Sequence, residues 1–315
     1  MARLRALHLL YSGSEKGGAQ RVAIECAKHN SDLYTSTVKP GRLVGLLQEK
    51  SLRSLEFNKL IFNDKFDLVF CSDPRALLFS FLCLKSVFSK KHLILHSDKL
   101  IKHKVLIAVF CRVLRAHILC TTQTQFDAFK GLSDDVSLVR IVDAPIMKNP
   151  CKKTDNILYF GRFDKIKNIQ EITDIFSSAR EKIGSLKLIL VGHGEEVPAN
   201  ADGVDIISDW MSQDELVKVM EGCSFVINAT SHEGFSLQIM EGISNGLLPL
   251  VKSKGLISNY NLSEECNLNV ENVVKAIEMN DVDWKELVIK FQKSLHTYLR
   301  NTVHLKDYVK YETGC

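Results

Sequence analysis

No apolar run in this sequence reaches the ~20 consecutive residues that a membrane-spanning helix needs. The nearest candidate, residues 105–119, is broken by Arg112, Arg115 and His117. Residues 1–18 combine basic residues with a short apolar run, but the run has only the length of a strand and leads into a glycine loop, unlike a signal peptide. We therefore expect a cytoplasmic protein with no membrane span.

Paired cysteines and metal-binding clusters are also missing. The nine cysteines are odd in number and show no C-x-x-C spacing, which predicts reduced thiols rather than a disulfide framework. No His, Cys and Asp cluster has the spacing of a metal site. The Asp281-Val-Asp283 triplet matches a D-x-D metal pattern, but it precedes a predicted helix at residues 284–299, so we interpret it as a helix cap. We expect neither a metal nor a cofactor.

What remains is an ordinary globular composition. The chain has 315 residues, 45% hydrophobic content and neither a repeat nor a low-complexity segment. This length fits two domains. Apolar strand patterns alternate with helical patterns in both halves, which predicts an α/β fold with two doubly wound sheets. Residues 143–154 contain two prolines and no period, so we expect a linker there, between a first domain of residues 1–145 and a second of residues 146–300.

Positive charge is concentrated in the first half. Residues 1–145 hold 22 Lys and Arg against 13 Asp and Glu. Within residues 84–115, a single acid, Asp98, stands against Lys85, Lys90, Lys91, Lys99, Lys102, Lys104, Arg112 and Arg115. Cations on apolar helices are typical of a protein that binds an anionic membrane surface. Nucleic acid is a weaker alternative because interleaved aromatic residues are missing, and a solvated basic face is the third interpretation.

Residues 223–252 are predicted to form a strand, a loop, a helix and a second strand. Glu233 then lies in the loop at the carboxyl end of the first strand, and Glu241 lies about two turns along the helix. Ligands bind at the carboxyl ends of strands in open α/β sheets, and free N–H groups at a helix start hold anions. Two solvated surface acids are the simpler interpretation. A carboxylate also accepts hydrogen bonds from sugar hydroxyls, so the loop suits a nucleotide sugar.

Earlier in the second half, a predicted strand at residues 156–160 is followed by Gly161-Arg162-Phe163 and then Lys167. An arginine fork and a lysine point charge would both bind phosphate oxygens. Cations near a helix start oppose its positive end unless an anion binds there. The next predicted strand, residues 186–191, ends in a tight turn, Gly192-His193-Gly194.

Taken together, the segment from Glu233 to Glu241, the Gly161-Arg162 segment with Lys167 and the turn at Gly192 resemble the family-4 glycosyltransferases of the GT-B fold, in the order typical of that family. The resemblance implies two Rossmann-like domains facing across a cleft and a final helix, within residues 301–315, that crosses back to the first domain. It implies catalytic roles for Arg162, Lys167, Glu233 and His96, and donor binding by Gly17, Gly18, Gly161, Gly192, Trp210, Met211, Gly234, Phe235, Ser236, Leu237 and Glu241. Trp210 would stack on a base or simply cover the core.

The activity that the resemblance implies is a metal-independent, retaining transfer of a hexose or N-acetylhexosamine from a UDP- or GDP-sugar, with UDP preferred. We expect the acceptor to be a glycan, lipid-linked, of surface polysaccharide or lipopolysaccharide synthesis, and the enzyme to be peripheral at the inner face of the membrane. Nucleic acid is not an expected partner. Two alternatives stay open, namely a non-catalytic nucleotide-sugar-binding subunit and another GT-B enzyme such as a sugar-nucleotide epimerase.

Overall fold

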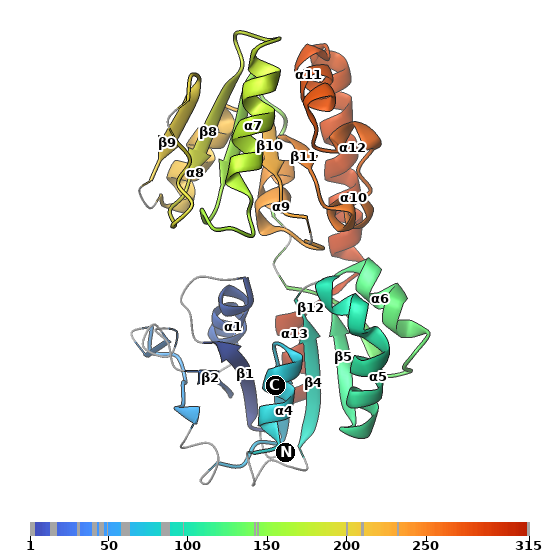
Figure 1. The fold of residues 1–315 in the computed structure, drawn as a ribbon. Helices are drawn as coiled ribbons and strands as arrows, with labels where there is room; N and C mark the ends of the chain where they lie inside the picture. The colour runs from blue at the N-terminus through green and yellow to red at the C-terminus, as the bar shows by residue number, and fades with distance from the viewer. Residues whose placement is uncertain are drawn as a thin grey trace. The chain divides into compact units, whose positions relative to one another are not determined.

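The computed structural model describes residues 4–12, 18–29, 32–39, 43, 47–48, 50–57, 64–82, 89–96, 98–141, 143, 145–199, 201–208, 211–231 and 233–313. The chain divides into two compact units (Figure 1). Unit 1 consists of Met1–Asp143 together with Asn301–Cys315, and unit 2 of Ala144–Arg300. The chain therefore enters unit 2 once and returns to unit 1 for its last residues.

Unit 1 is built on a parallel sheet of seven strands in the order β12-β6-β5-β4-β3-β1-β2. Every neighbouring pair is parallel. The strands are β1 Ala6–Ser12, β2 Leu33–Lys39, β3 Leu68–Cys71, β4 Lys90–Leu95, β5 Ala116–Cys120, β6 Val136–Arg140 and β12 Val303–His304. Parallel strands need helical crossovers, and these cover the sheet and keep its apolar strands from water.

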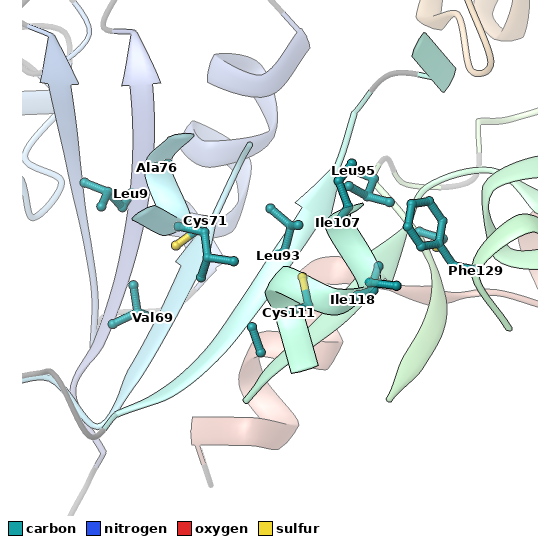
Figure 2. Close-up of a cluster of buried hydrophobic side chains, with 14 of the residues drawn as sticks. Leu9, Val69, Cys71, Ala76, Leu93, Leu95, Ile107, Cys111, Ile118 and Phe129 are labelled. Carbon is teal, nitrogen blue, oxygen red and sulfur yellow. The ribbon is translucent and has the colours of Figure 1, made fainter. Parts of the chain in front are cut away.

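The described helices of unit 1 are α1 Gly18–His29, α4 Pro74–Ser80, the 3₁₀ helix η2 Asp98–His103, α5 Lys104–Val113, α6 Gln123–Lys130 and α13 Leu305–Thr313. Figure 2 shows how α5 contributes to the core: Ile107 and Cys111 lie against Leu93 and Ile118 of the central strands. The carboxylate of Asp73 caps α4, accepting hydrogen bonds from the backbone N–H groups of Arg75 and Ala76.

Unit 2 has a parallel sheet of five strands in the order β11-β10-β7-β8-β9. The strands are β7 Asn156–Phe160, β8 Lys187–Val191, β9 Val204–Ile207, β10 Phe225–Asn228 and β11 Leu248–Val251. The chain runs outward from β7 to β9, then returns to the other side of β7 for β10 and β11. Two doubly wound parallel sheets confirm the predicted α/β fold class.

The described helices of unit 2 are α7 Ile169–Arg180, α8 Gln213–Glu221, α9 Leu237–Ser244, α10 Lys254–Asn259, the 3₁₀ helix η3 Glu264–Cys266, α11 Val270–Glu278 and α12 Asp281–Arg300. The longest helix, α12, packs against α9 and β11 through an apolar face that includes Trp284, Phe291 and Leu295 (Figure 1). No helix in the described part of the chain is both long and apolar enough to cross a membrane.

Two sequence predictions need correction. Asp281 and Asp283 do not cap the last long helix, because α12 already begins at Asp281 and the Asn280 side chain accepts hydrogen bonds from the N–H groups of Val282 and Asp283. The predicted terminal helix begins with a strand, because Val303–His304 pairs with β6 before α13 starts.

The basic stretch is also not wholly helical. Lys90 and Lys91 lie on β4, which runs beside β3 and β5. Lys90 forms an ion pair with Glu312 of α13 at 2.7 Å, and Lys91 is buried. Lys91 is therefore part of the interior of unit 1, and Lys90 links β4 to α13 at the surface.

Candidate functional site

The candidate site lies where the strand order of unit 2 reverses. β7 and β10 are neighbours, although β8 and β9 separate them in the sequence. In a doubly wound sheet, such a switch point leaves a crevice beyond the carboxyl ends of the two strands, and ligands bind there. The loops that follow β7 and β10 carry Lys167 and Glu233.

Lys167 and Glu233 are brought together by the fold. The Lys167 Nζ lies 3.0 Å from Oε2 and 3.2 Å from Oε1 of Glu233. Their side chains are 21% and 20% exposed, so the pair lies partly in solvent. Asn228, at the end of β10, donates from its amide to Glu233 Oε2 at 3.3 Å and to Gln238 at 2.8 Å. The carboxylate therefore has both a charged and a neutral donor.

The backbone of the Glu233 loop is fixed by the last residue of α10, Asn259, and by the two residues that flank this helix, Ser253 and Tyr260. The Glu233 N–H donates to the hydroxyl of Ser253, which in turn donates to the Glu233 carbonyl at 2.7 Å. The Asn259 amide donates to the Gly234 carbonyl, and the Tyr260 hydroxyl donates to the Ser236 carbonyl at 3.0 Å. Ser253, Asn259 and Tyr260 are buried. They form a rigid support under the loop.

The loop after β7 is organised by Asp164. Its carboxylate accepts a charged contact from Arg162 at 3.0 Å, and its backbone carbonyl and Oδ1 accept the Lys167 N–H. The Tyr159 hydroxyl donates to the Arg162 carbonyl at 2.7 Å. Burial raises the pKa of Tyr159, which keeps it a donor. Arg162 has 46% of its side chain exposed, so its guanidinium can reach an anion in solvent.

Glycine is required where the loops after β7 and β8 touch. A Cβ on Gly192, whose φ is +156°, would lie 1.8 Å from the Gly161 carbonyl oxygen. A Cβ on Gly194 would lie 2.0 Å from the Phe163 carbonyl oxygen. Hydrogen bonds from Gly161 N–H to the Val191 carbonyl and from Phe163 N–H to the His193 carbonyl continue the strand pairing into the loops. These glycines bring bare backbone to the crevice.

Helix α9 presents the second acid. It begins after Ser236, whose hydroxyl accepts the Ile239 N–H, and Leu237 is its first residue. Glu241 lies one turn further along and is partly buried. The pKa of the Tyr260 hydroxyl is raised, chiefly by burial and then by Tyr298, Glu233 and Glu241.

A second ion pair sits close to the first in the chain. The Lys252 Nζ lies 2.6 Å from both carboxylate oxygens of Glu171 in the first turn of α7. Asn168, which precedes α7 in the left-handed conformation with φ 54°, also donates to Glu171. This contact ties the end of β11 to the segment that carries Lys167. The sequence analysis did not find it, although a polar residue after a strand end was a usable signal.

Other predicted donor residues have structural contacts of their own. The Phe235 ring packs against the rings of Tyr260 and Tyr298, with centroids 5.6 and 6.0 Å apart. Met211 is half-buried just before Ser212, the residue that caps α8. Trp210 lies outside the described residues, and so does Gly17.

Two of the predicted residues that the structure describes belong to unit 1. Gly18 is the first residue of α1. His96 directly follows β4, and its Nε2 is buried without a hydrogen-bond partner among the described residues. Burial lowers the pKa of His96 to about 4, and Asp73 opposes that effect. His8 of β1, hydrogen-bonded to Ser72 at 2.8 Å, has its pKa lowered to about 3 by burial and by His96.

The fold thus joins Lys167 to Glu233 and places Gly161 against Gly192, whereas Arg162 pairs with Asp164 instead of with another predicted residue. Sequence reasoning missed the supporting set of Asn228, Gln238, Ser253, Asn259 and Tyr260. Side chains of this kind give no motif signal. Among the described residues, no group of three or more His, Cys, Asp or Glu side chains converges in a way that could hold a metal ion.

Part of unit 2 is similar to a known protein family. Residues 154–277, which contain the whole candidate site of unit 2, match the family model described as glycosyl transferases group 1. The matched residues all lie within unit 2. Among the curated proteins, none matches the sequence of this chain.

Solved structures resemble the chain over nearly its whole length. Anabaena HepE in complex with UDP and glucose is 14% identical, with a TM-score of 0.67 and coverage of 95% of this chain and 98% of that one. A glycosyltransferase from Rickettsia africae is 14% identical, with a TM-score of 0.63 and coverage of 96% and 95%. The E. coli trehalose-6-phosphate structure with bound UDP-2-fluoro glucose is 10% identical, with a TM-score of 0.61 and coverage of 98% of each chain. The chain therefore has the GT-B fold.

Proposed function

We propose that this protein is a retaining glycosyltransferase that moves a hexose or an N-acetylhexosamine from a nucleotide diphosphate sugar, UDP-sugar in preference to GDP-sugar, to a glycan acceptor. The observation that carries the proposal is the Lys167–Glu233 pair at the switch point of a glycosyl transferases group 1 domain. The UDP and UDP-glucose complexes of Anabaena HepE support this donor class.

In the structure, the Lys167 ammonium and the Glu233 carboxylate neutralise each other. A diphosphate carries more charge than a carboxylate and would attract the Lys167 ammonium more strongly. Binding of the donor would then release the Glu233 carboxylate, whose oxygens become available to hydroxyls of the transferred sugar. Asn228 holds the carboxylate in place during this exchange. Glu233 thus occupies the position on Lys167 that a phosphate group of the donor would take.

Arg162 and Lys167 would stabilise the negative charge that grows on the leaving diphosphate. Stabilisation of developing charge by preorganised donors is commonly the largest catalytic term. The exposed guanidinium of Arg162 offers a planar fork for two phosphate oxygens. Glu241 would accept hydrogen bonds from the nucleotide ribose. For retention, we infer front-face attack by the acceptor, assisted by the leaving phosphate.

A donor screen tests the proposal. Purified protein is incubated with UDP- and GDP-sugars, and released nucleotide diphosphate is measured. We expect Lys167→Met to lower turnover about 10²–10³-fold, because it removes a charge-assisted contact to the leaving group. Lys165→Met is the matched control, since Lys165 is exposed only two residues away. Equal turnover of the Lys167 variant and the wild type would contradict the assignment, as would failure to release nucleotide from any donor.

We further infer that transfer needs no divalent metal, since two cations occupy the place where a metal would act on the diphosphate. Activity should survive EDTA with less than a twofold change. Activity lost in EDTA and restored by Mn²⁺ or Mg²⁺ would overturn this part of the proposal while leaving the donor assignment intact. The acceptor that we propose is a lipid-linked glycan of surface polysaccharide or lipopolysaccharide synthesis.

A further inference from the structure

Helix α5 of unit 1 exposes a row of large apolar side chains. Val105, Leu106, Val109 and Val113 are 59%, 70%, 55% and 73% exposed. Their spacing places them on one side of the helix, along its whole length. We name these four residues the α5 ridge. A continuous row of this kind differs from the scattered apolar residues that every protein surface carries.

The ridge is not part of the core of unit 1. The opposite side of α5, with Ile107, Ala108 and Cys111, is buried against the sheet (Figure 2). The helix therefore has two apolar sides, and the fold uses only one of them. An ordinary surface helix would have polar residues on its outer side.

Cations flank the ridge. Lys102 and Lys104 lie at its beginning, and Arg112 and Arg115 at its end, all exposed. Residues 98–115 contain a single acid, Asp98, which precedes the first ridge residue by seven positions. No carboxylate among the described side chains forms an ion pair with these four cations. The surface is thus apolar in its centre and positive at both ends.

We propose that the α5 ridge docks unit 1 on an anionic phospholipid surface. Apolar side chains on an interfacial helix enter the boundary between headgroups and acyl chains, and the flanking Lys and Arg side chains reach the phosphates. Charge complementarity selects the occupant, because a protein groove would have to supply acids at both ends. The phosphates of a nucleic acid would bind the cations but would leave the four aliphatic side chains of the ridge exposed to water.

This interaction goes beyond the sugar transfer and is tested without donor or acceptor. Wild-type protein is sedimented with vesicles of phosphatidylcholine alone or mixed with phosphatidylglycerol. We expect binding only with the anionic lipid. Leu106→Gln/Val109→Gln should weaken it at least tenfold. Lys102→Glu/Lys104→Glu/Arg112→Glu should weaken it about a hundredfold, because each cation near the surface contributes about fivefold, equivalent to ~1 kcal/mol.

Matched controls lie on α12 of unit 2. Lys285→Glu/Lys290→Glu/Lys293→Glu changes the same net charge, and Val282→Gln/Ile289→Gln removes a comparable exposed apolar pair. Both controls should bind within twofold of the wild type. If the cation variant loses binding and the ridge variant does not, α5 is only a solvated basic face, and the proposal is wrong. Failure of the wild type to bind anionic vesicles would also overturn it.

Insertion itself has a separate readout. Tryptophan placed by Leu106→Trp should be quenched by brominated lipid, whereas Ile289→Trp on α12 should not. Quenching does not depend on a variant losing function. A protein that is dimeric in solution, with a dimer broken by Leu106→Gln/Val109→Gln and vesicle binding unchanged, would assign the ridge to contact between copies of the chain and exclude the lipid surface.

Discussion

Glu233 has two roles in our account, and a substitution can separate them. Its carboxylate neutralises the Lys167 ammonium in the structure. In our proposal, the carboxylate accepts hydrogen bonds from the transferred sugar once Lys167 binds the diphosphate. Glu233→Gln keeps the hydrogen bond from Asn228 but removes the competing charge. We expect UDP to bind this variant at least as tightly as the wild type, and sugar transfer to fall at least about tenfold, because a charged acceptor contributes more than a neutral one.

Calorimetric titration with UDP, next to a turnover assay, checks this expectation. Weaker UDP binding in Glu233→Gln, to the extent expected for Lys167→Met, would mean that the carboxylate helps to hold the nucleotide and does not compete with it.

A buried histidine gives unit 1 a pH dependence. His92 is fully buried, stacks on Phe70 at 4.7 Å, and finds no hydrogen-bond partner among the described residues, although Glu312 lies 3.9 Å away. Burial, followed by His117 and Lys90, lowers its pKa from 6.5 to about 3. Between pH 6.5 and about pH 3, His92 is therefore protonated in the unfolded chain and neutral in the folded protein. The contribution of neutral His92 to the free energy of unfolding is fully present above pH 6.5 and is lost progressively as the pH falls toward 3.

We expect His92→Phe to reduce this pH dependence by about 1 kcal/mol for each pH unit below 6.5. Urea unfolding of the whole chain at pH 7.5 and 5.5 measures it. The control is His296→Phe, at an exposed position on α12 in unit 2, which should leave the pH dependence unchanged. An unaltered difference between the two pH values in His92→Phe would show that the ring is not the source.

At the scale of elements, the loops after β7 and β8 depend on the absence of a side chain at Gly192. Gly192→Ala would set a Cβ 1.8 Å from a backbone oxygen, so one loop must move. We expect the free energy of unfolding to fall by ~1–3 kcal/mol and UDP to bind more weakly. Gly184→Ala, where no atom lies within 4 Å of the added Cβ, should change stability by less than about 0.5 kcal/mol. Equal stability of the two variants would refute the packing argument.

Sequence patterns predicted the elements that carry long apolar runs. The strand predicted at residues 156–160 is β7, Asn156–Phe160, and the strand predicted at residues 186–191 is β8, Lys187–Val191. Helix α8 was missed, because few apolar positions mark it and its start depends on a capping box between Ser212 and Glu215. β12 could not be predicted, because two residues form a strand only when β6 is already beside them.

Side-chain partners were the least predictable feature of the site. Lys167 and Glu233 were both singled out by motif, yet their contact joins residues 66 positions apart. The pairing of Arg162 with Asp164 competes with the phosphate contact that the motif suggests. Such contacts depend on loop geometry that no local propensity encodes. The roles of all the named site residues, including His96 and Glu241, stay predictions.

At the scale of the whole molecule, the order of motifs along the chain predicted the GT-B fold, and the structure and its solved relatives confirm it. The division of labour between the units is part of the proposal. Unit 2 contains the residues that match the glycosyl transferases group 1 model and the Lys167–Glu233 pair, while unit 1 contains His96 and the α5 ridge. Donor binding should therefore respond to changes in unit 2, and lipid binding to changes in unit 1.

The most direct test of the central claim is the affinity of the full chain for UDP, measured by calorimetry for the wild type, Lys167→Met and the control Lys165→Met. We predict that UDP binds the wild type and Lys165→Met with equal affinity, and Lys167→Met about ten- to a hundredfold more weakly, since a charge-assisted contact contributes ~1.5–3 kcal/mol. If UDP binds Lys167→Met as tightly as the wild type, the switch point of unit 2 is not the diphosphate site, and the account is wrong.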